Sequence, residues 1–106
     1  MILGLQKTDA FLHDFALQAL WYVREAGDDV ARDFQIAVDA RLRLLCTQPG
    51  SGRLRCFKHP KLHGLRSFPL ERPFDRILLF YRVSGSNLQA VRLMHGARDL
   101  SNRLVE

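Results

Sequence analysis

Two stretches with a helical repeat, separated by one glycine, constrain the fold of this chain more than any other feature of its sequence. Between residues 9 and 26 the apolar residues recur with a period of about 3.6, which predicts an amphipathic helix. Its apolar side consists of Leu12, Ala16, Ala19 and Val23, widened by Phe15, Leu20 and Tyr22. Thr8 or Asp9 can cap the start of this helix, and Gly27 can end it in the left-handed conformation.

A second helical stretch begins at Asp28 or Asp29 and ends before Pro49-Gly50. Its apolar residues are spaced by three and four positions, at Ala31, Phe34, Val38, Leu42 and Leu45. Because the link between the two helices is so short, they must lie antiparallel. The first half of the chain therefore predicts a helical hairpin.

The second half of the chain changes to the patterns of extended strands and turns. Residues 65–70 are predicted to be extended, with Pro69 at a sheet edge or a bulge. Residues 76–83 form the clearest strand, and residues 88–94 return beside it after a turn rich in Ser and Gly. Residues 1–6 are predicted to form a short first strand.

These elements predict an α+β domain in which an N-terminal strand and an antiparallel helical hairpin pack on a three- to four-stranded antiparallel sheet. A chain of 106 residues has apolar material for one core, so residues 1–106 are predicted to form a single domain. The helices should cover one face of the sheet and leave the other face open. Alternation places Arg82 beside Leu78 and Phe80, and it places Arg92 beside Leu88, Ala90 and Met94. An arginine among apolar neighbours either reaches out to water or belongs to a binding surface.

The net charge of +5 is concentrated in the second half of the chain. Residues 1–50 carry 5 basic and 7 acidic residues, whereas residues 51–106 carry 11 basic and 4 acidic residues. This balance favours an anionic partner, either a nucleic acid or an acidic protein segment. A solvated basic surface that only aids solubility has the same composition.

Composition also bears on compartment and cofactors. The longest apolar run, residues 77–81, is too short to cross a membrane, and the N-terminus lacks the features of a secretory signal. We therefore expect a cytoplasmic protein with no membrane partner. Cys46, Cys56, His59 and His63 form the one group of soft metal ligands, but the spacing of the cysteines does not suit zinc. We expect two free thiols, no metal and no cofactor.

Short motifs spread over nearly the whole chain point to a protein family. They are Phe15…Trp21-Tyr22, Leu44-Leu45…Pro49-Gly50-Ser51-Gly52, Gly64-Leu65-Arg66, Arg76-Ile77…Phe80-Tyr81-Arg82-Val83 and Val91-Arg92-Leu93-Met94-His95-Gly96-Ala97-Arg98-Asp99. Together they closely resemble the RelE/ParE superfamily of bacterial type II toxins, and the closing His-Gly-Ala-Arg-Asp resembles its ParE branch. The resemblance implies a small basic toxin that is neutralised by a cognate antitoxin encoded beside it.

The two branches of the superfamily imply different targets. The ParE branch is associated with growth inhibition through DNA gyrase and with plasmid stabilization, and the RelE branch with ribosome-dependent cleavage of mRNA. A basic nucleic-acid-binding module is a third alternative. It ranks below the others because no helix-turn-helix, RNP or zinc-finger pattern accompanies the charge.

Cleavage of RNA without a metal needs a base, an acid and cations that stabilise the charge on phosphorus. Arg66, Arg76 and Arg98 match arginine positions of the RelE pattern. Phe68 replaces its second basic residue on the strand, and the tail from residue 101 has no Tyr. His95 is a candidate replacement acid or base, because its ordinary pKa suits proton transfer. Since the proton-transfer groups are incomplete, a gyrase inhibitor is favoured over a ribonuclease, so we assign no catalytic residues.

The resemblance and the charge pattern together predict two contact surfaces. The predicted target-binding residues are Arg66, Arg76, Arg82, Arg92 and Arg98. Of these, Arg66, Arg76 and Arg98 are expected to converge at one end of the open face. The predicted antitoxin-binding residues are Trp21, Tyr22, Phe68 and Leu70. Adjacent helix positions point about 100° apart, so at least one of Trp21 and Tyr22 should be exposed.

Overall fold

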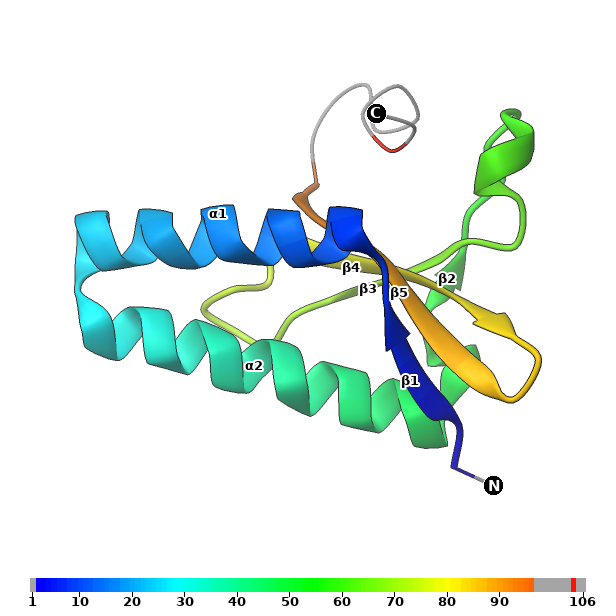
Figure 1. The fold of residues 1–106 in the computed structure, drawn as a ribbon, viewed down its shortest axis with the longest axis horizontal. Helices are drawn as coiled ribbons and strands as arrows, with labels where there is room; N and C mark the ends of the chain where they lie inside the picture. The colour runs from blue at the N-terminus through cyan, green and yellow to red at the C-terminus, as the bar shows by residue number, and fades with distance from the viewer. Residues whose placement is uncertain (1, 97–103, 105–106) are drawn as a thin grey trace.

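A computed structural model of the protein describes residues 2–96 and Leu104. The elements in chain order are β1 (Gly4–Lys7), α1 (Asp9–Ala26), α2 (Asp28–Thr47), the 3₁₀ turn η1 (Pro49–Ser51), β2 (Arg53–Leu54), the 3₁₀ turn η2 (Pro60–Leu62), β3 (Arg66–Pro69), β4 (Ile77–Ser84) and β5 (Asn87–His95). The two helices form an antiparallel hairpin that lies beside one sheet and extends well past its end (Figure 1). This arrangement confirms the predicted α+β class.

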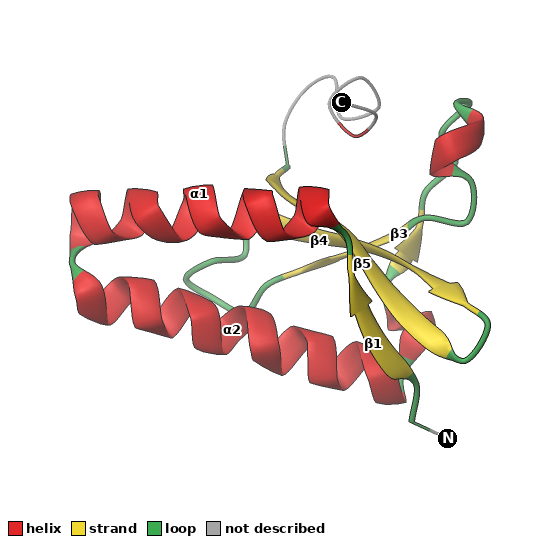
Figure 2. Ribbon diagram, viewed as in Figure 1, coloured by secondary structure: helices red, strands yellow, loops and turns green. Residues whose placement is uncertain are grey.

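The sheet has five strands in the order β1-β5-β4-β3-β2, one or two more than predicted (Figure 2). Strands β2 to β5 are antiparallel, whereas β1 pairs in parallel with β5 and places Gly4 opposite Asn87. The sheet is therefore mixed rather than antiparallel. The sequence did not reveal β2 because two residues are too few to show an alternating pattern.

The ends of the helices follow the predicted capping residues. The Thr8 side chain accepts a hydrogen bond from the backbone N–H of Phe11 at 3.0 Å and caps α1. Gly27 has a φ of 95° and separates the two helices, as the sequence predicts. Helix α2 ends at Thr47, directly before the turn that contains Pro49. These local signals set the length of the hairpin.

The two helices bury their apolar residues differently. In α2 the predicted face is buried, with Phe34, Val38, Leu42 and Leu45 in the core. In α1 the predicted face is right only in part. Phe15, Ala19 and Tyr22 face the core as predicted, together with Phe11, whereas the predicted residues Leu12, Ala16, Leu20 and Val23 are exposed. Apolar residues surround most of α1, whereas α2 and the sheet cover only one side of it. The other side is left as an exposed apolar surface.

An aromatic cluster joins the helical hairpin to the loop between β3 and β4. Phe34 is fully buried, and its ring centroid lies 5.4 Å from that of Phe15, 5.1 Å from that of Tyr22 and 5.7 Å from that of Phe74. Phe74 comes from the loop after β3, which passes behind the two helices in Figure 1. Each such aromatic pair contributes about 0.5–1.5 kcal/mol beyond the burial of its area. The loop thus supports the part of the hairpin that lies beyond the sheet.

The face of the sheet turned away from the helices is partly covered, and the expectation of an open face is wrong. Leu62, Leu65, Phe80, Met94 and Leu104 form a second buried cluster there. The segment between β2 and β3 folds over this side, since it carries Leu62 on η2. The cluster therefore gives the sheet a small second core.

A β-bulge in the β4–β5 pair corrects the predicted neighbours of Arg92. The register pairs Tyr81 with Ala90 but Phe80 with Arg92, so Val91 is the extra residue. Leu88 and Ala90 consequently face the helices, whereas Arg92 and Met94 turn to the other side. Arg82 lies on this same side together with Leu78 and Phe80, as the alternation predicts.

Candidate functional site

A groove of about 490 Å³ lies between α1 and the end of β5. Its lining consists of Asp14, Leu17, Gln18 and Trp21 from α1 and Leu93, Met94 and His95 from β5. Leu17 is 56% exposed and Trp21 is 54% exposed, so two large apolar side chains stand at the surface of the groove. Exposed apolar groups beside polar ones are typical of a protein interaction site. This groove is the candidate functional site.

Asp14, one of the residues that line the groove, forms an ion pair with Arg92 that joins α1 to β5. Arg92 Nε donates to Asp14 Oδ2 at 2.7 Å, and Arg92 Nη2 donates to Asp14 Oδ1 at 3.0 Å. The two side chains are only 11% and 12% exposed. The pair is therefore bidentate and largely shielded from water.

Asp14 also completes the edge of the sheet. Strand β1 ends at Lys7, so the part of β5 after Ala90 has no neighbouring strand on that side. There the Thr8 hydroxyl donates to the carbonyl of Val91 at 2.8 Å, and Asp14 Oδ2 accepts from the N–H of Leu93 at 3.1 Å. The first turns of α1 thus take the place of a sixth strand and leave the groove above them.

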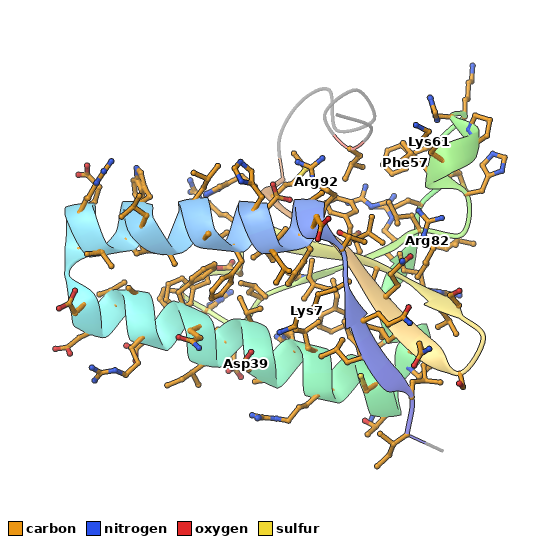
Figure 3. The ribbon with its side chains drawn as sticks, viewed as in Figure 1. Lys7, Asp39, Phe57, Lys61, Arg82 and Arg92 are labelled. Carbon is orange, nitrogen blue, oxygen red and sulfur yellow. The ribbon has the colours of Figure 1, made fainter. Side chains whose placement is uncertain are left out.

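The predicted role of Arg92 in target binding is corrected by this pairing. Its guanidinium is buried between α1 and β5, and the Asp14 carboxylate balances its charge. Arg92 lies beside the first turns of α1 in Figure 3. Its role in the structure is to fasten the helix to the sheet.

Trp21 and Tyr22 point in different directions, as their adjacent positions predict. Trp21 is exposed at the groove and contacts Tyr22 edge-on at 5.2 Å between ring centroids. Tyr22 is half-buried against Phe34 and Phe74, and this burial raises the pKa of its hydroxyl above the usual value. Trp21 is thus available to a partner, and Tyr22 supports it from below.

The other two predicted antitoxin contacts lie on β3 and after it, on a different side of the molecule. Leu70 is 1% exposed in the main core, so it has no surface to offer, and its predicted contact is wrong. Phe68 is half-buried, with the guanidinium of Arg41 at 4.9 Å from its ring centroid. Arg41 Nε also donates to the carbonyl of Pro69 at 2.9 Å, so an α2 side chain pairs with the backbone at the end of β3.

The candidate basic residues do not gather in one place. Arg66 lies opposite Tyr81, whereas Arg76 directly precedes β4, whose first residue, Ile77, pairs with His95. The offset from Tyr81 is five residues for Arg76, or about 17 Å, and four residues for Ile77 and its partner His95, or about 14 Å, so Arg66 is far from both. The two arginines also fall on opposite faces by alternation. The predicted convergence is therefore not found for Arg66 and Arg76, and Arg98 lies outside the described residues.

Tyr81 holds the turn beside Arg66, a role that its place in an apolar strand did not indicate. Its hydroxyl donates to the carbonyl of Pro49 at 2.7 Å and accepts from the N–H of Gly52 at 2.8 Å. Arg66 Nη1 donates to the carbonyl of Gly52 at 2.9 Å. Burial raises the pKa of Tyr81, although the Gly52 N–H and the charge of Arg66 act in the opposite direction. These contacts hold the turn of residues 49–52, which leads directly into β2.

The cysteines, the possible metal ligands and the hydropathy of the helices were the other features of interest in the sequence. Cys46 is buried and Cys56 is exposed, and neither forms a disulfide. Over residues 2–96 and Leu104, no three His, Cys, Asp or Glu side chains come together where a metal ion could bind. Within that same part of the chain, neither helix has the length and hydropathy required to span a membrane.

Comparison with known proteins decides the family. Residues 5–100 match the model of the ParE toxin of the type II toxin-antitoxin system, parDE. The chain belongs to the ParE toxin family. A comparison with curated proteins found no match. The fold is similar to a solved structure of the chromosomal ParDE TA system from P. aeruginosa, with a TM-score of 0.71 and 22% identity over 89% of this chain and 96% of that chain.

The ParE toxin match takes in the whole candidate site. Every residue that lines the groove lies between Asp14 and His95, inside the matched range of residues 5–100. Arg66, Arg76 and Arg82 lie inside it as well. The groove and the separated arginines are therefore parts of the ParE toxin domain itself.

Proposed function

We propose that this chain is the toxin of a type II toxin-antitoxin pair, that it arrests growth by inhibiting DNA gyrase in the cytoplasm, and that a cognate antitoxin neutralises it. The match to the ParE toxin family supports the toxin role. Inhibition here means binding to gyrase, with no bond made or broken by the toxin.

The separation of the candidate catalytic residues carries the choice between inhibitor and ribonuclease. A ribonuclease needs its base, acid and cations within hydrogen-bond reach of one phosphate and its neighbours. Arg66 lies about 17 Å along the sheet from Arg76 and faces the opposite way, and it lies about 14 Å along the sheet from His95. Phe68 stands where the RelE pattern has a basic residue. These facts favour an inhibitor, with Arg66 and Arg76 as proposed contacts of its target.

The groove beside α1 is the proposed site of the antitoxin. An amphipathic helix binds in a groove by placing apolar side chains at i, i+3 and i+4 against apolar anchors. Leu17 and Trp21 are four residues apart on α1 and present such anchors. Tryptophan is common among residues that dominate binding energy at interfaces. The basic second half of the chain would attract acidic flanks of the same segment.

Induced expression in bacteria tests the proposal. Expression of the chain alone should stop growth and trap gyrase on cleaved DNA, and co-expression of the neighbouring reading frame should restore growth. Primer extension on cellular mRNA should show no new cuts. Growth arrest with codon-specific mRNA cuts that vanish in His95→Ala would instead establish the ribonuclease.

A further inference from the structure

The strands of the sheet carry positive charge and no negative charge. None of the five strands contains Asp or Glu, and the whole segment from Ala40 to Leu70 lacks acidic residues. The same segment contains seven lysines and arginines. Five of these seven lie in the stretch from β2 to β3, at Arg53, Arg55, Lys58, Lys61 and Arg66, and the other two lie on α2.

Three arginines lie on the sheet face that is turned away from the helices. Arg55 follows β2, and its N–H donates to the carbonyl of Leu65 at 2.9 Å. The register that pairs Arg66 with Tyr81 puts Leu65 opposite Arg82. Arg55 and Arg82 thus flank Leu65 in one row across three strands, about 9.5 Å apart. Arg53 lies two residues before Arg55 and shares its face.

Hydrogen bonds to uncharged groups hold two of these guanidinium groups in place. Arg55 Nε donates to Ser67 Oγ at 2.8 Å, and its guanidinium lies 5.8 Å from the ring centroid of Phe80. Arg82 Nη2 donates to the carbonyl of Lys61 at 2.8 Å, and Arg82 Nε is buried without a partner. Figure 3 shows Lys61 and Phe57 above Arg82, on the segment between β2 and β3. Both side chains are fixed by neighbours that leave their charge uncompensated.

In the part of the chain that the structure describes, no carboxylate lies within 4.0 Å of Arg53, Arg55 or Arg82. Burial and the charge of Arg53 lower the pKa of Arg55, which means that both disfavour its positive charge. Arg92 on the same face differs, because Asp14 balances it. A bound anion would relieve this repulsion among the three unbalanced arginines.

We propose that Arg53, Arg55 and Arg82, the arginine face, bind the backbone phosphates of a nucleic acid, with Lys61 beside them. The planar fork of arginine suits a phosphate group, and its fixed orientation here reduces the entropy lost on binding. Two residues along a strand span about 6.6 Å, comparable to the distance between neighbouring phosphates of one nucleic-acid strand. Contacts of this kind carry no sequence information, so the binding should not depend on base sequence.

This inference does not depend on gyrase as the target, because nucleic acid alone is the ligand. The purified full chain would be titrated against a short fluorescent DNA duplex and an RNA strand of the same length. Binding should weaken as salt rises, and each phosphate contact contributes about 0.9 to the slope of log K against log salt on duplex DNA. The nucleic acid bound more tightly identifies the natural ligand.

Single substitutions locate the site. Arg53→Ala and Arg82→Ala should each weaken binding about tenfold and reduce the salt slope by about 0.9. Arg24→Ala and Arg43→Ala remove the same charge from exposed helix positions and should change affinity less than about twofold. Thermal melts should show that Arg53→Ala keeps the fold, since the Arg53 side chain is exposed.

Three results would overturn the proposal. The first is absence of binding to both nucleic acids at low salt. The second is an equal loss of affinity in the helix controls, which would show that net charge alone acts. The third is preference for a polyglutamate peptide over both nucleic acids, which would make the arginine face a protein contact.

Discussion

Replacing Asp14 with alanine removes the carboxylate that fastens α1 to the sheet edge. In the native protein this carboxylate accepts hydrogen bonds from Arg92 Nε, Arg92 Nη2 and the N–H of Leu93. The Arg92 side chain is only 11% exposed. Asp14→Ala therefore leaves a largely buried guanidinium without its counter-charge and the edge of β5 without an acceptor.

The size of the effect follows from this burial. Breaking a buried ion pair by removal of one partner costs about 3–5 kcal/mol. The lower value applies here, because the groove gives water some access to the pair. A domain of this length loses about 4 °C of Tm per kcal/mol, so Asp14→Ala should lower the Tm by about 12 °C or more. Such a loss is a large part of the 5–15 kcal/mol that stabilises a typical domain.

Thermal unfolding followed by circular dichroism measures this change. Asp29→Ala is the matched control, since the Asp29–Arg32 pair is exposed and its atoms are 3.8 Å apart, and it should leave the Tm nearly unchanged. The double variant Asp14→Leu with Arg92→Leu should recover much of the lost stability, because no buried charge remains. The reasoning is refuted if Asp14→Ala melts like the native protein, or if the double variant is no more stable than Asp14→Ala.

Three further predictions concern the groove, the thiols and a buried tyrosine. Trp21→Ala should weaken antitoxin binding at least about 30-fold in calorimetry, as loss of an interface anchor does, while Ile36→Ala, an exposed control on α2, should not; equal effects would contradict the groove assignment. Cys56 should react rapidly with a thiol reagent and Cys46 only after unfolding, because Cys46 is buried and its pKa is raised; equal rates would contradict its burial. The raised pKa of Tyr81 contributes stability that is complete below its unfolded pKa of about 10 and is lost as pH rises through the folded value. Denaturant melts at about pH 9 and about pH 11 should therefore show a smaller pH-dependent loss in Tyr81→Phe than in the native protein, and an equal loss would contradict this role.

Local patterns in the sequence were sufficient to predict the helical hairpin and the main strands. The cap at Thr8, the left-handed Gly27 and the β-rich run of β4 act through residues close in the chain. The buried side of α1 was predictable only in part, since Phe15, Ala19 and Tyr22 face the core but Leu12, Leu20 and Val23 do not. Its apolar residues surround most of the helix, and only the packed structure shows which of them contact α2 and the sheet.

The candidate site was predictable only in part, because most of it depends on distant residues. Trp21 followed from the angle between adjacent helix positions. The pair of Asp14 and Arg92 joins residues 78 positions apart, and a bulge at Val91 reverses the alternation that placed Arg92 on the wrong face. Neither feature leaves a local signal. The arginine face also depends on register, since β2 is two residues long and brings Arg55 level with Arg82.

Gyrase supercoiling with purified components tests directly whether this chain inhibits gyrase. Relaxed plasmid, gyrase and ATP would be incubated with increasing amounts of the purified chain, with and without its antitoxin. We expect supercoiling to fall as the chain is added and to return when the antitoxin is present. Unchanged supercoiling at saturating amounts of a folded chain that still arrests growth would contradict this expectation.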